Sequence, residues 1–488
     1  MSKSSSGGKT LFNVKTMMWI GYGLLALYAI ASVVFIVFLI GLNMLPMVYL
    51  ATIVILQAIA GVILSLFHGR KMSHSIISSK ITILLIILLV IGSSFVHLTS
   101  ETIEEITAIE VETDIVSVFV LNEDPAETLE DARDYLFGIA REVDRENTDR
   151  AILEINEYIE SSISTRELDD LVELADALKA NEVGAIIIND ALIRIVADME
   201  GYDWIRTGLR VLKMVENVVL VEEPPLEPPA VLPAVFIMLM TGIDTYGDVS
   251  ARARSDVNIL AVVNTDDKEI LLLSTPRDAF VTFDLSGDVG DKLAHAGIYG
   301  VDQTVSALER LYDINIDYFF RLNFTGFMDI IDALGGIDVY SEYHFTVYPV
   351  RTYTVGWNHL SGIEALAFTR ERYGFAAGDH QRAIHQMEVI RALVARATSP
   401  ALLMNYNSVM TAVGGSFQSN MPRSQVADIV RMQLSDMAGW NIITFSTTGV
   451  SDRGQTFSMP GHNLYIIHLH EQSIEEAQRL INETMRIE

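Results

Sequence analysis

Three long apolar segments stand near the start of the chain, at Met17–Leu42, Met44–Phe67 and Ile81–Leu98. A helix of about 18–20 apolar residues crosses a hydrocarbon core of ~30 Å, so each segment is predicted to be a transmembrane helix. The first segment is too long for the apolar core of a signal peptide, and no small-residue cleavage site follows it. Residues 1–100 are therefore expected to form a membrane region.

Downstream of residue 100, shorter apolar runs alternate with amphipathic stretches, which predicts an α/β accessory domain over residues 101–223. Asn189-Asp190 follows one of the strands and is expected to cap the helix after it. The acidic residues in the helical stretches have the spacing of a solvated face, so no catalytic role is assigned to this domain. The indicated elements are strands Ile115–Leu121 and Val183–Ile188 and helices Ala126–Val143 and Ala191–Met199.

A proline-rich segment, residues 224–233, separates this region from the rest of the chain and is expected to be a semi-rigid linker. After it, apolar runs and helical periods predict a second α/β domain over residues 234–488, with a hairpin around the polar turn at 264–267. The predicted strands are Ala234–Met240, Val257–Val263 and Glu269–Ser274, and the predicted helices are Thr304–Leu311, Gly326–Leu334, Gly362–Thr369 and Ala383–Ala397. The fold class is thus α/β behind three transmembrane helices.

Charge is divided unevenly between the two ends. The chain has a net charge of −29, yet the first 100 residues contain six basic residues and no acid, so the remainder holds 34 − 6 = 28 basic and 63 acidic residues. Such a surface repels nucleic-acid phosphates, and no basic cluster offsets it. Lys and Arg concentrate in cytoplasmic loops, so the N-terminus and the 70–80 loop are predicted to be cytoplasmic and residues 100–488 extracytoplasmic. The six basic residues are Lys3, Lys9, Lys15, Arg70, Lys71 and Lys80.

The chain has no cysteine, which excludes disulfides and thiolate metal sites. His295, His380 and His385 do not have the spacing of a helical histidine pair, so a zinc site is not predicted.

Charged and polar residues recur beside the predicted strands and helices of the second α/β domain, where open α/β sheets build their sites. Arginine forks suit bidentate phosphate binding, and two aspartates together with phosphate oxygens suit Mg²⁺. Residue types alone leave a second interpretation open, in which these are structural ion pairs. The residues are Asp244, Arg254, Asp256, Arg277, Asp278, Lys292, Arg370, Arg372, Arg382 and Gln386.

Taken in order, the motifs around these residues resemble the LytR-CpsA-Psr family of bacterial cell-envelope proteins from about Val235 to the C-terminus. Three helices and an accessory domain before the catalytic domain are similar to the capsule-associated CpsA branch. The motifs are Thr241-Gly-Ile-Asp244, Arg254-Ser-Asp256, Ser274-Thr-Pro-Arg-Asp278, Asp291-Lys-Leu-Ala-His-Ala296, Asn323-Phe-Thr-Gly-Phe327, Asp332-Ala-Leu-Gly-Gly336, Leu366-Ala-Phe-Thr-Arg-Glu-Arg372, Gly378-Asp-His-Gln-Arg382 and Gln386.

The resemblance implies a central sheet flanked by helices, with a hollow core for a polyprenyl chain and the pyrophosphate at its mouth. By position, Asp244 and Asp256 would hold Mg²⁺. Pyrophosphate contacts would come from the arginines of the motifs and from Lys292 and Gln386. The family's usual Arg-Gln is His385-Gln386 here, which removes one expected cation.

The implied function is transfer of capsular polysaccharide or a related glycopolymer from a polyprenyl (pyro)phosphate carrier to peptidoglycan in a Gram-positive cell membrane, with capsule-assembly proteins as further partners. Arg277, Asp278, Arg370 and Arg372 are the expected catalytic residues, with Asp278 as the candidate base. Both arginines flanking Glu371 can reach one headgroup only if the helix ends before Arg370 and the chain is then extended. Two other functions stay open: a non-catalytic binder or scaffold of capsule assembly, and a polyprenyl pyrophosphate hydrolase.

Overall fold

The structure is a computed structural model that describes residues 14–68, 72–107, 111–220, 226–376, 378–397, 405–414 and 416–486. Two compact units form it, Met1–Glu105 with Pro422–Gly439, and Ile106–Met421 with Trp440–Glu488. Lys3, Lys9, Arg70 and Lys71 of the charge argument, and Pro224 and Pro225 of the predicted linker, lie outside the described residues.

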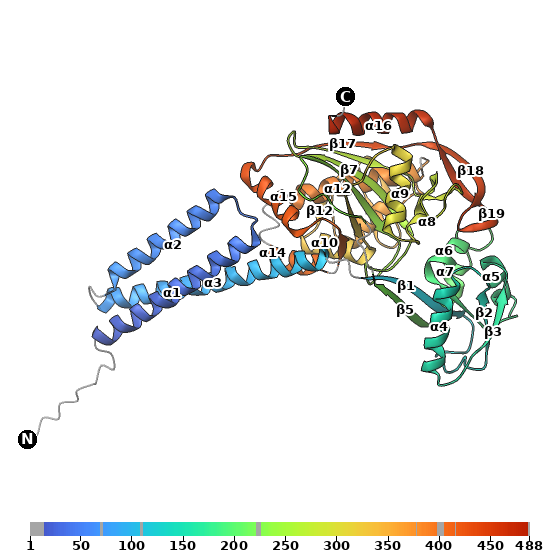
Figure 1. Ribbon diagram of the computed structural model, residues 1–488, viewed down its shortest axis with the longest axis horizontal. Helices are drawn as coiled ribbons and strands as arrows, with labels where there is room; N and C mark the ends of the chain where they lie inside the picture. The colour runs from blue at the N-terminus through green and yellow to red at the C-terminus, as the bar shows by residue number, and fades with distance from the viewer. Residues whose placement is uncertain are drawn as a thin grey trace, which may run out of the picture. The chain divides into compact units, whose positions relative to one another are not determined.

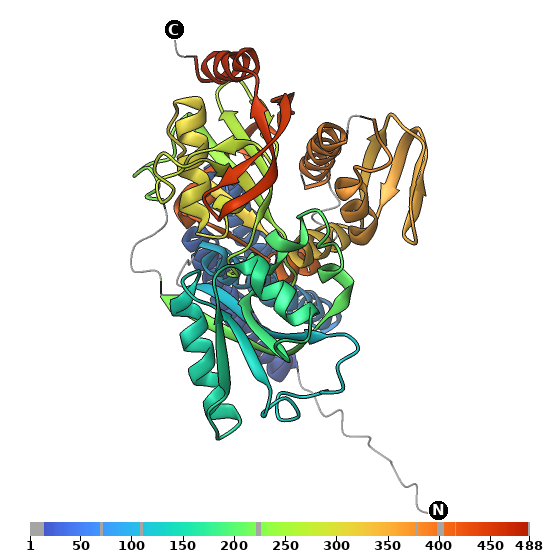
Figure 2. The same ribbon diagram turned by 90° about the vertical axis from the view of Figure 1, so that its right-hand side faces the viewer.

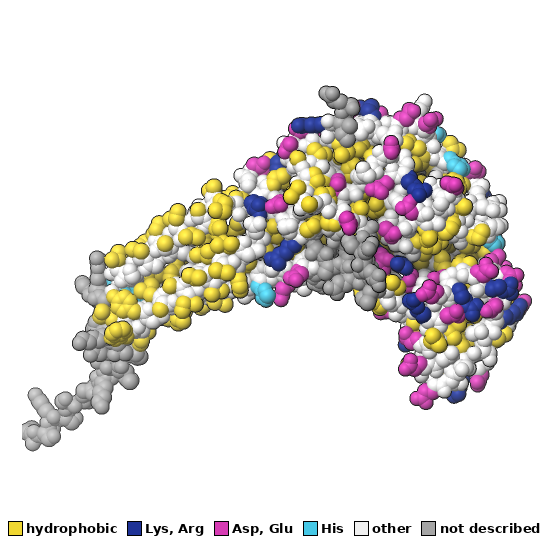
Figure 3. Space-filling view, in the orientation of Figure 1, with side chains coloured by type: hydrophobic (Ala, Val, Ile, Leu, Met, Phe, Trp, Pro, Cys, Tyr) yellow, Lys and Arg dark blue, Asp and Glu magenta, His cyan; other side chains and the backbone are white. Residues whose placement is uncertain are grey.

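The first unit contains three helices that are long and apolar enough to cross a membrane (Figure 1). They are α1 (Val14–Leu42), α2 (Met47–Phe67) and α3 (Met72–Thr107). Hydrophobic side chains cover their outer surface (Figure 3), as expected of a surface that faces lipid rather than water. The third helix extends beyond the predicted segment at both ends, because Ser and Thr residues that dilute the hydropathy do not interrupt a helix.

Helix α15 (Arg423–Asp436) belongs to the same unit although it lies late in the sequence. Its Ala427 is buried with Met44, which follows α1, and with Ile103 near the end of α3. Arg431 Nε donates a hydrogen bond to the carbonyl of Asn43 at 3.1 Å. The connection after α1 and the end of α3 therefore lie on one side of the helical group, against α15.

The accessory part of the second unit is a five-stranded sheet in the order β3-β2-β4-β1-β5. Strand β1 (Val111–Leu121) runs antiparallel to its two neighbours, the middle strand β4 (Ala185–Asn189) and the edge strand β5 (Leu209–Leu220). Strand β2 (Leu136–Ala140) lies between β4 and the edge strand β3 (Ser164–Leu168) and is parallel to both. Helices cover both faces, so the sheet has two buried sides: α4 (Arg145–Tyr158), α5 (Leu171–Lys179), α6 (Asp190–Ala197) and α7 (Ile205–Gly208).

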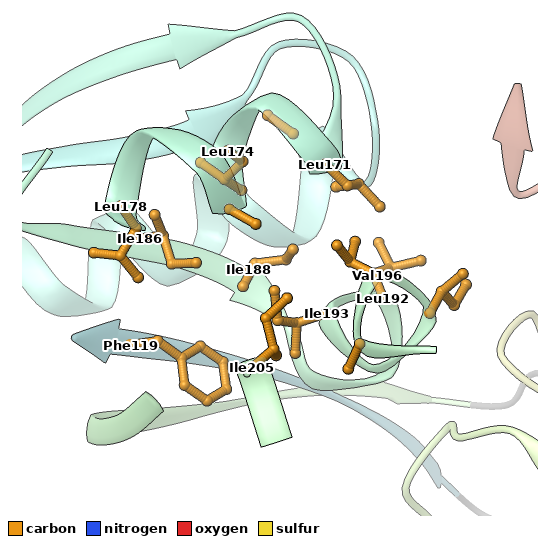
Figure 4. Close-up of a cluster of buried hydrophobic side chains, with 14 of the residues drawn as sticks. Phe119, Leu171, Leu174, Leu178, Ile186, Ile188, Leu192, Ile193, Val196 and Ile205 are labelled. Atoms are coloured by element: carbon orange, nitrogen blue, oxygen red, sulfur yellow. The ribbon is translucent and has the colours of Figure 1, made fainter. Parts of the chain in front are cut away.

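Side chains alternate along these strands and fill two separate cores. One core packs Val116, Val118 and Val120 against Ile155 of α4. The other packs Phe119, Ile186 and Ile188 against α5 and α6 (Figure 4). As predicted, Asn189 caps α6, and its side-chain oxygen accepts a hydrogen bond from Ala191 N at 2.9 Å.

The helix predicted over Ala126–Val143 is wrong: the chain turns through residues 122–135 and then forms β2. Carboxylates near its start bind backbone N–H groups locally, since Asp124 accepts from Ala126 N and Asp131 from Thr128 N. These bonds replace those of a helix, as short polar side chains often do. The final residues then pair with β3 and β4, where Phe137 and Ile139 are buried.

The rest of this unit is built on a six-stranded sheet in the order β16-β11-β6-β7-β8-β17. The three central strands are antiparallel neighbours, and β7 and β8 form the predicted hairpin. Parallel strands extend this centre on both sides, β11 beside β6 and β17 beside β8, and β16 closes one edge. The bounds are β6 (Val235–Ile243), β7 (Ser255–Asn264), β8 (Glu269–Ser274), β11 (Tyr318–Leu322), β16 (Phe417–Ser419) and β17 (Asn441–Ser446).

Helices lie on both faces of this sheet, which makes it a three-layer α/β arrangement (Figure 2). On one face Ile237 and Leu239 pack with α9 (Val301–Tyr312) and α16 (Glu471–Met485). On the other face Ile259 and Ala261 pack against Met387 of α12 (Asp379–Ala397). The predicted fold class, α/β with a central sheet flanked by helices, is confirmed.

The remaining elements are short helices and two-stranded pairings around this sheet. They are β9 (Phe280–Val281), β10 (Asp291–Lys292), β12 (Ile337–Ser341), β13 (Phe345–Val347), β14 (Arg351–Tyr353), β15 (Gly356–Leu360), β18 (Gly449–Thr456), β19 (Met459–Leu469), α8 (Leu293–Ala296), α10 (Phe324–Ala333), α11 (Gly362–Arg370) and α14 (Tyr406–Val413).

A buried ionic cluster joins the accessory sheet to the six-stranded sheet. Glu112 of β1 binds Arg252 Nε at 2.7 Å and Arg321 of β11 at 3.4 Å. Backbone bonds run alongside, with Thr113 N donating to Ser250 O and Arg252 N to Thr113 O. These ion pairs and hydrogen bonds connect the accessory sheet to the six-stranded sheet at the start of β1.

Candidate functional site

A cavity of about 660 Å³ lies within the second unit, between the accessory helices α6 and α7 and the α12 face of the six-stranded sheet. Much of its wall is apolar, with side chains from both sheets and from α12. These include Ile193, Leu209, Val211, Met240, Val257 and Ile390. Charged side chains line the remainder of the wall, so the cavity has the two-part character that an amphiphilic ligand requires.

Strand directions explain why charged residues far apart in the sequence meet here. Asp244 follows β6, Asp256 lies at the start of β7, and Arg277 follows β8. Because these three strands are antiparallel neighbours, the end of β6, the start of β7 and the end of β8 lie at the same edge of the sheet. Arg254, just before β7, joins them there.

The four residues form a buried network of ion pairs. Arg277 NH1 contacts Asp256 Oδ2 at 2.7 Å, and Arg254 contacts Asp244 through NH2. Burial alone would lower the pKa of both guanidiniums, but the surrounding carboxylates, Asp256 foremost, raise it above the ordinary value. Both arginines therefore carry a full charge at the cavity wall at any physiological pH.

Arg370 and Arg372 line the same cavity from a chain that changes conformation between them. Helix α11 ends at Arg370, one residue later than predicted, and Glu371 is extended with φ −68° and ψ 126°. Glu371 turns away, as expected, and accepts a hydrogen bond from Gly374 N at 2.8 Å. Arg370 lies 4.5 Å above the Phe324 ring, and Arg372 donates to the Tyr373 hydroxyl at 2.9 Å.

Arg382 and Gln386 complete the set from one face of α12, where their i, i+4 spacing places them side by side. Eight of the ten predicted site residues thus line one cavity: Asp244, Arg254, Asp256, Arg277, Arg370, Arg372, Arg382 and Gln386.

The other two, Asp278 and Lys292, do not line the cavity and instead pair with each other at 3.1 Å. Burial would raise the pKa of Asp278, but Lys292 and Arg277 more than offset this and lower it below the ordinary value. The structure therefore places the candidate base in an ion pair with Lys292, with Arg277 Nε 3.9 Å from the same carboxylate.

The carboxylates at the cavity suit a divalent cation. Asp256 Oδ1 is buried and has no hydrogen-bond partner among the described residues, while its Oδ2 binds Arg277. Over the described ranges, no three His, Cys, Asp or Glu residues gather as a metal cluster. Mg²⁺ usually takes only one or two protein carboxylates and completes its shell with water and substrate phosphate, so Asp244 and Asp256 fit it.

His385 does not face the cavity but lies buried among phenyl rings, 4.2 Å from Phe368 and 5.4 Å from Phe345 between ring centroids. Burial lowers its pKa to about 4, against the opposing effect of its hydrogen bond to the Phe368 carbonyl. The imidazole is therefore neutral at physiological pH and contributes packing rather than charge.

Sequence reasoning missed the contribution of the accessory part. Asp190, Arg194 and Asp198 all line the cavity, with Arg206 from α7 beside them. The first three follow an i, i+4, i+8 spacing along α6, whose intervening positions are almost all buried and apolar. A charged stripe on an otherwise apolar helix was the signal available in the sequence.

Comparisons with known proteins agree with the motif analysis. The model of the LytR_cpsA_psr family matches residues 233–480. The chain is 33% identical over 193 residues to the polyisoprenyl-teichoic acid–peptidoglycan teichoic acid transferase TagU of Bacillus cereus, covering 39% of this chain and 62% of TagU. It is 31% identical over 258 residues to the equivalent transferase TagT of Bacillus subtilis, covering 50% of this chain and 75% of TagT.

Among solved structures, the Lin1025 protein of Listeria innocua is 28% identical, with a TM-score of 0.42 over 52% of this chain and 100% of that protein.

Proposed function

Because the chain belongs to the LytR_cpsA_psr family, we propose that it transfers a glycopolymer from a membrane-bound polyprenyl (pyro)phosphate carrier to peptidoglycan. The observation that carries the proposal is a single cavity with a largely apolar wall and a group of arginines, of which Arg254, Arg277 and Arg382 are buried. A polyprenyl diphosphate has the matching division into an apolar tail and an anionic head. The protein's relatives are named for the same type of transfer.

The arginines supply what the reaction needs most. Phosphoryl transfer and glycosyl transfer from such a carrier both develop negative charge on the departing phosphate, and fixed cations in a water-poor site stabilise that charge. Arg277 and Arg254 are held in place by carboxylates, and Arg370 by the Phe324 ring, so little reorganisation is needed when the charge forms. Mg²⁺, held by Asp244 and Asp256, would neutralise further charge on the headgroup when bound.

The acceptor is a hydroxyl of peptidoglycan, whose proton passes to a carboxylate as the new bond forms. Asp256 and Asp244 line the cavity, whereas Asp278 lies behind it in its pair with Lys292. The geometry therefore favours a cavity carboxylate over Asp278 for this role.

The glycopolymer belongs to the anionic cell-wall class. The relatives act on teichoic acid by name, while three helices and an accessory domain ahead of the family domain support a capsular polysaccharide and, with it, the CpsA branch. Capsule-assembly proteins are the corresponding partners, and the cell membrane of a Gram-positive bacterium is the location.

The test uses the full-length chain in lipid nanodiscs with labelled lipid-linked glycan, peptidoglycan and Mg²⁺. The expected result is label bound covalently to peptidoglycan, lost in Asp256→Ala and kept in Asp266→Ala, an exposed residue of the β7–β8 turn. Label that stays on the lipid in the parent protein would identify a binder or scaffold. Label released into solution as free glycan or glycan phosphate, without peptidoglycan attachment, would identify a hydrolase.

A further inference from the structure

The carboxylate of Asp198 contacts two buried arginines of the cavity, Arg254 and Arg277. Its Oδ2 lies 2.5 Å from Arg254 NH1 and 3.3 Å from Arg277 NH2. Asp198 directly follows α6, so it reaches these arginines from the accessory part and not from the family domain. Although burial would raise the pKa of Asp198, Arg254, Arg277 and Arg206 hold it well below the ordinary value. The side chain is therefore an anion under all physiological conditions.

An anion in this position occupies the contacts that a donor phosphate would use. Each guanidinium already directs one N–H group at Asp198, and the others are engaged in part by Asp244 and Asp256. A phosphate that binds both terminal nitrogens of Arg254 or of Arg277 would require Asp198 to move away. The terminal nitrogens of both arginines are thus engaged from within the chain, whereas both Nε atoms are buried without a hydrogen-bond partner among the described residues.

Resting on the proposed function, we infer that Asp198 is an internal competitor for the donor diphosphate, and that donor binding exchanges Asp198 for phosphate on Arg254 and Arg277. The accessory part then sets how much negative charge a ligand must bring before it is accepted. A prenyl diphosphate carries enough charge to displace one carboxylate, and a ligand with less charge is disfavoured.

Arg206 makes this exchange accessible. It contacts Asp198 through the other carboxylate oxygen, Oδ1, at 2.5 Å, and it is about half exposed. The Asp198 side chain is itself 19% exposed, so water reaches it. When Asp198 leaves the buried pair, it keeps one charged partner at the surface and is never an unpaired buried charge, which would be costly.

Two substitutions are expected to act in opposite directions on binding of farnesyl diphosphate, measured by calorimetry with the full-length chain in nanodiscs. Asp198→Asn removes the competitor and should tighten binding about tenfold. Arg206→Gln removes the partner that receives Asp198 and should weaken binding several-fold. In the Asp198→Asn background, Arg206→Gln should have no further effect, because the exchange no longer takes place.

The matched control is Glu200→Gln, two residues away, which removes the same charge from an exposed pair with Arg453. An equal gain of affinity in Glu200→Gln would overturn the inference, since the effect would then be one of general charge. Unchanged or weaker binding in Asp198→Asn would overturn it as well, and would mark Asp198 as a residue that positions the arginines. So would a loss from Arg206→Gln that persists in the double variant, because Arg206 would then contact the phosphate itself.

Inorganic pyrophosphate, titrated in parallel, separates headgroup exchange from tail binding: the same signs are expected with lower affinity. Binding of farnesyl diphosphate that is lost in Arg370→Gln but unmoved by Asp198→Asn would overturn the exchange and leave the proposed function intact. Absence of binding to every variant would overturn both.

Discussion

The positions of Arg370 and Arg372 depend on the extended backbone of one residue, Glu371, which lies between them. On a continuous helix, residues two apart point about 200° apart, so only one of these arginines would reach the cavity. The extended conformation of Glu371 brings both to the lining and sends its own carboxylate toward Gly374. The motif alone predicted this geometry, with the helix end displaced by one residue.

Replacing Arg370 or Arg372 by Lys should reduce glycopolymer transfer roughly ten- to a hundredfold, because a bidentate charge-assisted contact contributes about 1.5–3 kcal/mol. Retention of the lipid donor should fall less, since the planar fork matters most as charge develops on the leaving phosphate. Parallel assays of attachment and donor binding separate the two effects. Arg391→Lys, on the exposed side of α12, is the control; equal losses of binding and attachment would argue for a pure binding role.

His385 predicts a pH dependence of stability. The pKa of His385 is about 4 in the folded chain and 6.5 for an ordinary histidine, as in the unfolded chain. Between pH 4 and pH 6.5 the protein therefore takes up a proton when it unfolds. The contribution is complete above pH 6.5 and is lost as pH falls toward 4, which amounts to on the order of 2–3 kcal/mol for one buried imidazole. His385→Phe should lack this part of the acid sensitivity in urea unfolding followed from pH 7 to 4. Identical pH curves for both proteins would contradict the buried, neutral imidazole.

At the scale of helices and strands, the close approach of α10 and α11 positions the site. A Cβ on Gly362 would stand 2.7 Å from the Met328 Cα, and the nearest atom is the Met328 carbonyl. The Met328 backbone cannot rotate away as a side chain can, so α10 and α11 must move apart if Gly362 is replaced by a larger residue. Arg370 at the far end of α11 and Phe324 at the start of α10 depend on that contact.

Gly362→Ala is therefore expected to destabilise the protein by about 1–3 kcal/mol and to reduce transfer without touching the cavity. Thermal unfolding of the purified chain measures the first effect. Gly374→Ala is the control, because its Cβ would have no backbone atom within van der Waals contact and the position is exposed. A variant as stable as the parent would mean that α10 and α11 have more freedom than the structure shows.

Periodicity predicted β6, β7 and β8 of the six-stranded sheet, because their apolar faces are buried against α9, α16 and α12. It did not predict β11, β16 and β17. The resemblance of the motifs to a known family predicted eight residues of the cavity. Six of them lie near strand or helix ends, and Arg382 and Gln386 lie on α12. The structure of residues 126–143 was predicted wrongly, because the hydrogen bonds that Asp124 and Asp131 accept in turns prevail over the helix propensity of the segment. Asp198 was not predicted as a site residue, because its contacts depend on the packing of α6 near the six-stranded sheet, whose first strand begins more than 35 residues later in the sequence.

At the scale of the whole molecule, the charge pattern predicts that residues 100–488 lie outside the cell. The packing of α15 supports this, because it contacts Asn43 and Ile103, which the same topology places on the outer side. Protease added to intact spheroplasts should degrade the large domain and leave an N-terminal epitope tag protected. Survival of the large domain until lysis would contradict the topology.

The chain enters the accessory sheet on β1 and leaves it on β5, and Val111 and Leu220 are direct partners across that pair. Paired strand residues lie about 5 Å apart, so the two ends of the accessory part lie next to each other. In evolutionary terms the accessory part is a cassette: a single recombination event adds or removes it without rerouting the six-stranded sheet. Because this cassette carries Asp198 and Arg206, the selectivity of the arginine site can be inherited, lost or exchanged between lineages as one piece of gene, while the arginines themselves stay unchanged.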